Sequence, residues 1–199
     1  MPMMLLAHVV YTQYRRALTP FRFFTLTIFM VSLLALLLSF SSNASVCSEN
    51  WKITGYYSPI ESDFPYDKNA SVMVQKQGPV AFNATFLKEV KMEGWGRTRY
   101  GWYLGYFSRK WHKSENPLDA RGQNLKLGAV AIDRQYLKMG NKISIPQVND
   151  VIGVPWFVAS DVGSAIKQKH IDVYTGEGKL AKQTSWKVTG QKQVCITRT

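Results

Sequence analysis

Residues 157–174, FVASDVGSAIKQKHIDVY, are the stretch of sequence that decides the fold. The first three residues are compact and apolar, as a buried strand requires. The last five alternate with period two, so Ile171 and Val173 face the core while Asp172 faces away from it. Between these two strands, Asp161 is a good N-cap for one or two helical turns. The stretch therefore predicts a strand, a short helix and a second strand, with two acids placed at or near strand ends.

Asp161 and Asp172 could each have a structural or a functional role. Asp161 alone fits the N-cap of a short helix over residues 162–166. Asp172 has no such structural task, because aspartate is depleted in strands. A third acid, Asp133, closes an apolar run and precedes a helix-like turn over residues 134–138. Residue chemistry alone leaves the structural and functional readings of the acid pair evenly balanced.

Four short motifs resemble a known family. Residues 131–133 (AID), 159–167 (ASDVGSAIK) and 171–174 (IDVY) resemble the three-aspartate (3D) domain of bacterial cell-wall proteins. Residues 54–59 (TGYYSP) resemble the Gly-Tyr-Tyr motif of membrane-bound lytic transglycosylase A, which also has a 3D domain. The resemblance covers residues 52–195. It implies a mainly β fold, a six-stranded double-psi β-barrel with short helices.

The same resemblance implies a function. A lytic transglycosylase cleaves the MurNAc–GlcNAc bond of peptidoglycan and leaves 1,6-anhydro-muramoyl ends. One carboxylic acid suffices, because the C6 hydroxyl of the muramoyl sugar is itself the nucleophile. The resemblance assigns the catalytic acid/base role to Asp172 and a supporting catalytic role to Asp161, whose negative charge favours protonated Asp172.

The sequence departs from the family at Ser164 and Gln168, where glycine is usual. The chain is also expected to be too short for the transglycosylase's additional large domain. The alternative function is a non-catalytic, expansin-like module that binds cell-wall peptidoglycan.

Residues 94–111 interleave aromatic side chains with arginine and glycine. This composition suits stacking on sugar rings, and its other reading is an aromatic core with turns. From this segment and the motifs above, we expect the following substrate-binding residues: Tyr56, Tyr57, Trp95, Arg97, Tyr100, Asp133 and Lys167.

Residues 1–44 read as a targeting segment. Three arginines precede the uncharged apolar run 23–40, and a small-residue cleavage site ends at Ala44. The run is near the lower limit for a spanning helix, which needs about 20 residues. Cleavage as a signal peptide and retention as an N-terminal hydrophobic anchor helix are both open. Either way, residues 45–199 are expected to be one exported domain, in the periplasm or cell envelope.

The charge of the chain restricts its partners. Lys and Arg number 25 against 13 Asp and Glu, a formal net charge of +12, and only three of the basic residues lie in the targeting segment. An exported basic domain suits an anionic wall polymer, and export argues against nucleic acid. We expect a monomer that meets the membrane only through its N-terminal segment.

The two cysteines, Cys47 and Cys195, lie at the ends of the exported part. In an oxidising compartment such a pair predicts one disulfide. The sequence has no Cys/His cluster suited to zinc and no Gly-x-Ser-x-Gly motif for acyl transfer. We therefore expect neither a metal nor a cofactor.

The remaining elements are short. Many short strands with little helix are typical of a β-barrel or sandwich. The residue pattern predicts strands at 51–57, 71–74, 142–145, 185–189 and 193–197, a helix at 86–90 and a polar loop at 116–128.

Overall fold

The computed structural model describes residues 45–65 and 68–197. The leader helix expected within residues 1–44 lies outside this part of the chain, so its structure and its cleavage stay predictions. Among the described residues, no helix has the length and apolar character needed to cross a membrane.

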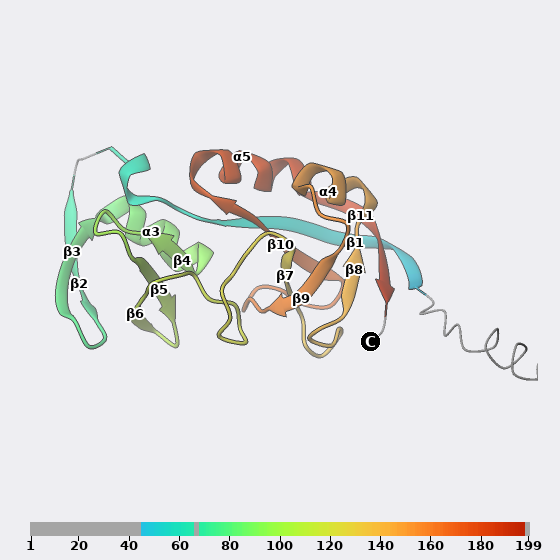
Figure 1. The fold of residues 1–199 in the computed structure, drawn as a ribbon, viewed down its shortest axis with the longest axis horizontal. Helices are drawn as coiled ribbons and strands as arrows, with labels where there is room; N and C mark the ends of the chain where they lie inside the picture. The colour runs from blue at the N-terminus through green and yellow to red at the C-terminus, as the bar shows by residue number, and fades with distance from the viewer. Residues whose placement is uncertain (1–44, 66–67, 198–199) are drawn as a thin grey trace, which may run out of the picture. The chain divides into compact units, whose positions relative to one another are not determined.

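Six strands close into a barrel in the order β1-β10-β7-β9-β8-β11 (Figure 1). The mainly β fold and the six-stranded barrel are thereby confirmed, while the double-psi connection stays a prediction. The barrel strands are β1 (Ser45–Ser58), β7 (Ala129–Ile132), β8 (Lys142–Ser144), β9 (Phe157–Asp161), β10 (His170–Glu177) and β11 (Gly190–Thr197).

The barrel core follows the predicted alternation of side chains. Ile53 of β1 pairs with Ile171 of β10, which pairs in turn with Ile132 of β7, and all three are almost completely buried. Val173 belongs to the same core cluster. The residues between these positions face out of the barrel, because successive side chains of a strand point to opposite faces.

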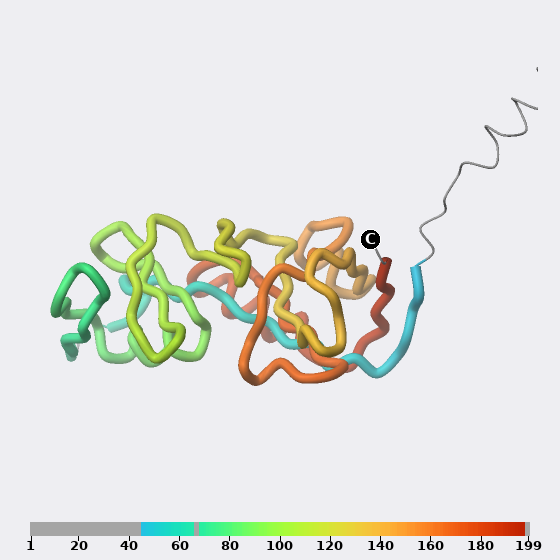
Figure 2. The backbone as a smooth tube through the Cα atoms, turned by 90° about the horizontal axis from the view of Figure 1, so that it is seen from below, coloured from blue at the N-terminus to red at the C-terminus, as the bar shows by residue number. Residues whose placement is uncertain are grey.

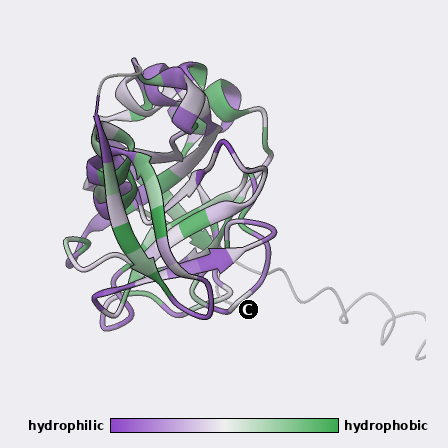
Figure 3. Ribbon diagram, turned by 90° about the vertical axis from the view of Figure 1, so that its left-hand side faces the viewer, coloured by the Kyte–Doolittle hydropathy of each residue, from purple (hydrophilic) through white to green (hydrophobic). Residues whose placement is uncertain are grey.

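Five strands between β1 and β7 form a second sheet, of which the sequence predicted only the strand at 71–74. Its order is β3-β2-β6-β5-β4, and α3 (Ala84–Glu93) packs against it. Hydrophobic and hydrophilic residues are mixed along its strands (Figure 3), and buried hydrophobic residues of β2, β3, β5 and β6 form a core cluster with the helix. The strands are β2 (Asn69–Val74), β3 (Gly78–Asn83), β4 (Trp95–Arg97), β5 (Tyr103–Phe107) and β6 (Lys110–Ser114).

Two further helices cover the barrel, α4 (Pro146–Ile152) and α5 (Gly178–Val188), and a 3-10 turn, η1 (Glu61–Asp63), follows β1. Helix α5 lies along β1 and β10 (Figure 1). The approach is so close that a Cβ atom on Gly55 would lie 2.6 Å from the Cα atom of Ser185. The glycine of the Gly-Tyr-Tyr motif is therefore required for packing.

Two predicted elements are wrong. Residues 185–189 end a helix, because Ala181, Ser185 and Val188 recur at helical spacing and are buried together. Residues 162–166 form a turn instead of a helix. The carboxylate of Asp161 accepts the amide of the very next residue, whereas an N-cap must accept an amide two or three residues on.

The other predicted elements are present. The predicted strands at 51–57, 71–74, 142–145 and 193–197 lie in β1, β2, β8 and β11. Helix α3 covers the predicted 86–90, and the side chain of Asn83 caps it by accepting the amides of Thr85 and Phe86.

Cys47 and Cys195 form the predicted disulfide. They stand directly opposite each other in the antiparallel pairing of β1 with β11, with Cα atoms 3.9 Å apart. Figures 1 and 2 both show the start of β1 beside the end of β11. The bond joins the two ends of the described chain at the seam that closes the barrel, and it fits an exported protein.

Candidate active site

The predicted acid pair lies in one row across the outer face of the barrel. Thr54 of β1 pairs with Asp172 of β10, Asp172 with Ala131 of β7, and Ala131 with Asp161 of β9. We call Thr54, Asp172, Ala131 and Asp161 the acid row. Adjacent strands lie about 4.8 Å apart, so the two acids stand about 10 Å apart at their Cα atoms. Ala131, between them, is buried in a cluster that includes Tyr56 and Tyr174.

Asp172 is partly buried, and burial is the main reason that its pKa is raised to about 6. The hydroxyl of Thr54 donates a 2.6 Å hydrogen bond to its Oδ1 atom, which opposes the rise, as does the charge of Lys52. The negative charge of Asp161 raises the pKa further. Asp172 can thus hold or release a proton near neutral pH, as an acid/base catalyst must.

Asp161 is held by three donors. The hydroxyl of Tyr56 donates to Oδ2 at 2.8 Å, the amide of Val162 donates to Oδ1 at 2.9 Å, and the amide of Ala120 also binds the carboxylate. Burial nevertheless raises its pKa, and the charge of Asp119 adds to the rise. The ring of Tyr56 also packs against Tyr174, with centroids 5.3 Å apart.

Thr54 also connects Asp172 to a buried histidine. The Nε2 atom of His170 lies 2.9 Å from the Thr54 hydroxyl oxygen, and the ring also hydrogen-bonds the backbone carbonyl of Ala165. Burial, aided by the charge of Lys52, lowers the pKa of His170, so the ring is neutral at physiological pH.

A further acid, Glu93, comes from the end of α3. Its Oε2 atom accepts the amide of Tyr57 at 3.1 Å. Burial chiefly raises its pKa to about 7, and the charges of Asp172 and Glu89 add to the rise. The Tyr57 amide and Lys182 act in the opposite direction. Glu93 therefore brings a third titrating carboxyl group close enough to interact with the acid row.

Replacing Glu93 by glutamine should make stability less dependent on pH. The folded pKa of about 7 lies above the ordinary value of 4.5, so the wild type loses stability as pH rises through this interval. The amide stays neutral, and we expect a gain of about 2 kcal/mol at pH 8 relative to pH 5, after allowing for solvent screening. Urea unfolding at both pH values measures this, with the exposed Glu115→Gln as control. Equal gains at both pH values would refute it.

The predicted substrate-binding residues of the Gly-Tyr-Tyr motif and the aromatic segment are not all gathered at the acid row. Tyr56 is there. Tyr57 is buried and donates its hydroxyl proton to Glu89 at 2.5 Å. Trp95 is buried against Phe107 in the second sheet. Its place shows that part of the aromatic segment is core.

Arg97 and Tyr100 are more exposed. A guanidinium nitrogen of Arg97 lies 3.9 Å from the carboxylate of Glu177 at the end of β10. Tyr100 is half exposed, stacks on Trp102 and donates to the carbonyl of Ala81 at 2.9 Å. Of Arg97 and Tyr100, Arg97 is the one that contacts a barrel strand carrying an acid.

Asp133 and Lys167 lie together beside the barrel. The two oxygens of Asp133 accept the amides of Gln135 and Gln168 at 2.9 and 2.8 Å, and these bonds lower its pKa. The charge of Lys167 acts in the same direction. Asp133 therefore joins two loops next to the site.

Thr54, His170 and Glu93 were not assigned roles from the sequence. Thr54 stands two positions before Tyr56, so the period of a strand places both on one face and was a usable signal. His170 stands two positions before Asp172, so the same period places it on the face of Asp172. Glu93 had no local signal, because its position depends on how α3 docks against β1.

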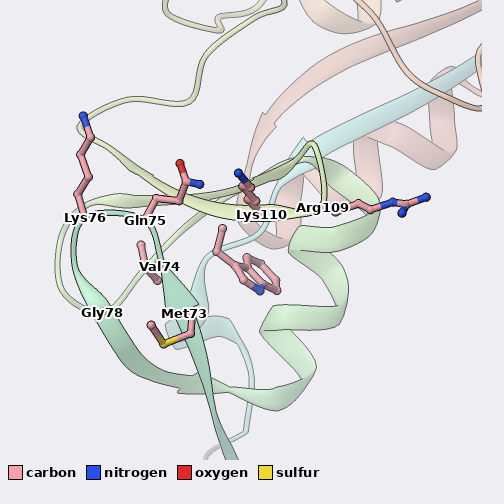
Figure 4. Close-up of a pocket in the computed structure, with 8 residues that line it drawn as sticks. Met73, Val74, Gln75, Lys76, Gly78, Arg109 and Lys110 are labelled. Atoms are coloured by element: carbon pink, nitrogen blue, oxygen red, sulfur yellow. The ribbon is translucent and has the colours of Figure 1, made fainter.

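A hollow at the second sheet, lined by Met73, Lys76, Arg109 and Trp111 among others, does not resemble a catalytic site. Figure 4 shows Lys76 and Arg109 extending in different directions, so their charges do not converge on one ligand. In the described part of the chain, no group of three His, Cys, Asp or Glu residues is placed to hold a metal.

Comparison with known proteins agrees with the fold of the barrel. Residues 128–197 match the 3D domain. No curated protein matches the sequence. E. coli MltA with bound chitohexaose is 16% identical, with 76% of this chain and 72% of that chain covered and a TM-score of 0.54.

A membrane-bound lytic murein transglycosylase from Agrobacterium tumefaciens is 14% identical, with coverage of 77% and 76% and a TM-score of 0.55. At these identities the similarity concerns the fold. Residues 128–197 thus match the 3D domain, and the matched 76–77% of the chain shares the fold of the MltA lytic transglycosylases.

Proposed function

We propose that the protein is a lytic transglycosylase that cleaves the MurNAc–GlcNAc bond of peptidoglycan and leaves 1,6-anhydro-muramoyl ends. One observation carries the proposal: Asp172 and Asp161 share one outer row of the barrel, and the pKa of Asp172 is raised to about 6. The similarity to folds of lytic transglycosylases supports it.

Asp172 performs both proton transfers. Its carboxylic acid protonates the oxygen between the two sugars, and the bond from C1 of the muramoyl sugar to that oxygen breaks. The C6 hydroxyl of the same sugar then bonds to C1 and gives its proton to the Asp172 carboxylate, which restores the acid. Asp161 stabilises the positive charge that develops on the sugar ring in the transition state.

His170 competes with ionised Asp172 for the single hydroxyl proton of Thr54. The neutral ring donates to Ala165 through one nitrogen, so its other nitrogen can only accept. Thr54 can donate to that nitrogen only while Asp172 is protonated and needs no donor. If Asp172 ionises, Thr54 must donate to it instead, and the buried nitrogen of His170 is left without a donor.

The variant His170→Leu should lower the pKa of Asp172. The Thr54 hydroxyl would then donate only to the carboxylate, which stabilises the ionised form by about 1 kcal/mol, so the alkaline limb of the pH–rate profile should move down by roughly one unit. NMR titration of the Asp172 carboxyl carbon measures the shift without requiring activity. Thr54→Ser keeps the hydroxyl and should keep the wild-type pKa. An unchanged pKa in His170→Leu would exclude this role.

The function is tested by incubating the protein with purified sacculi and analysing the released fragments by mass spectrometry. Anhydro ends are lighter by one water than hydrolysed ends and resist borohydride reduction. Reducing ends would indicate a hydrolase. Binding without release would establish the alternative, a non-catalytic wall-binding module.

We also propose that the protein acts outside the cytoplasm as a monomer. Residues 1–44 direct its export and either are removed or remain as a membrane anchor. We further propose that its barrel has the double-psi connection. The disulfide supports export. A reporter fused after Thr199 should be active only on the outer side of the membrane.

A further inference from the structure

A second hollow opens on the outer face of the barrel beside the acid row. Its volume is about 410 Å³, within the range of about 300–1,000 Å³ typical of ligand sites. Ala129 and Val158 line it and pair with each other on β7 and β9. Ala131, in the acid row, lies two residues beyond Ala129, a distance of about 7 Å along the strand. We call this space the barrel hollow.

One wall of the barrel hollow is the loop before β7, and this wall also contacts the acid row. Asp119 lines the hollow, and the next residue, Ala120, donates its amide to Asp161. The loop is fixed in shape, because Oδ1 of Asp119 accepts the amides of Arg121 and Gln123, both at 2.9 Å. The hollow and the acid pair are therefore parts of one preformed surface.

Another part of the lining is aromatic. Trp156 lines the hollow and is 49% exposed. The ammonium of Lys142 lies 4.7 Å from the ring centroid, and Lys142 is not among the lining residues. This contact orients the ring. The hollow thus combines an aromatic ring with polar side chains of the loop, among them Gln123 and Asn124.

We propose that the barrel hollow binds one pyranose ring of the glycan strand, next to the sugar whose bond is cleaved. A pyranose has an apolar face of C–H groups, which packs on an indole ring, and an edge of hydroxyl and acetamido groups, which hydrogen-bond to amide and charged side chains. Both kinds of surface are present in the lining of the hollow. This inference rests on the proposed function, because it takes the glycan strand as the ligand of the acid row.

The test measures binding of chitohexaose by calorimetry, in the full chain carrying Asp172→Asn so that no turnover occurs. Adding Trp156→Ala should weaken binding roughly tenfold, as loss of a central aromatic contact does. Trp156→Phe keeps a ring and should retain most of the affinity. Trp186→Ala is the matched control, because Trp186 is also exposed but lies on α5, and it should bind like the parent.

Equal affinity of the Trp156→Ala and Trp186→Ala proteins would overturn the proposal, and so would a parent protein that does not bind chitohexaose. Thermal unfolding of each variant checks that the fold is intact. The proposed function can fail separately from the sugar site. In that case the wild-type protein binds chitohexaose through Trp156 but releases no fragments from sacculi.

Discussion

Asp172→Asn should lose the release of anhydromuropeptides from sacculi by a factor of roughly 100 or more, the usual contribution of one acid/base group. The amide keeps the shape of the side chain and can still accept the Thr54 hydroxyl proton. It cannot give a proton to the leaving oxygen or take one from the C6 hydroxyl. Release is measured by chromatography and mass spectrometry of the soluble fragments.

Two further variants make this result specific. Asp161→Asn should cost less activity and move the pH optimum downward, because the negative charge that raises the pKa of Asp172 is gone. Asp150→Asn, at an exposed position of α4, should behave as wild type. Sacculus binding should survive in all three variants. Wild-type release by the Asp172→Asn protein would refute the assigned mechanism.

The sequence predicted the acid row better than its surroundings, for a physical reason. The alternation in residues 170–174 fixes which side of β10 holds Asp172, and no distant part of the chain is needed for that inference. Asp161 follows from the end of an apolar strand. The pairing that brings both acids to Ala131 depends on the closure of the barrel, which only the 3D resemblance implied.

The second sheet could not be predicted in this way, because its strands are short and do not alternate clearly between apolar and polar residues. Strand β4 has three residues, and it pairs with β5 across the turn that follows it. The glycines among the aromatic residues were read as features of a sugar-binding surface. Instead, a Cβ atom on Gly105 would lie 2.6 Å from the ring of Trp95, so this glycine makes room for a core side chain.

Helix α5 shows a different limit of prediction from the sequence. Residues 185–189 taken alone resemble a strand, and the helical pattern appears only when Ala181 is included. Glu93 shows a third limit, because a helix-terminal glutamate is ordinarily a solvent-exposed residue. Its raised pKa comes from burial at the contact with Tyr57, which no local pattern contains.

Removing the disulfide should have the largest effect on stability. The bond joins residues 148 positions apart, and closing so long a loop stabilises the folded state by about 5 kcal/mol on the chain-entropy model. For a domain of this size, the double variant Cys47→Ser/Cys195→Ser should lose about 10–20 °C in Tm. Thermal and urea unfolding with and without a reducing agent measure the loss.

Removal of the disulfide should also destabilise the acid row. The bond lies on the seam between β1 and β11, and β1 carries both Thr54 and Tyr56. When the barrel unfolds, Thr54 separates from Asp172 and Tyr56 from Asp161. Activity should therefore fall at the temperature where the double variant unfolds, and reduced wild type should match it. The Ser45→Ala protein, altered at an exposed position of β1 near the bond, keeps the disulfide and serves as control. Equal unfolding midpoints for oxidised and reduced wild type would show that strand pairing alone closes the barrel, and that the disulfide adds nothing to its stability.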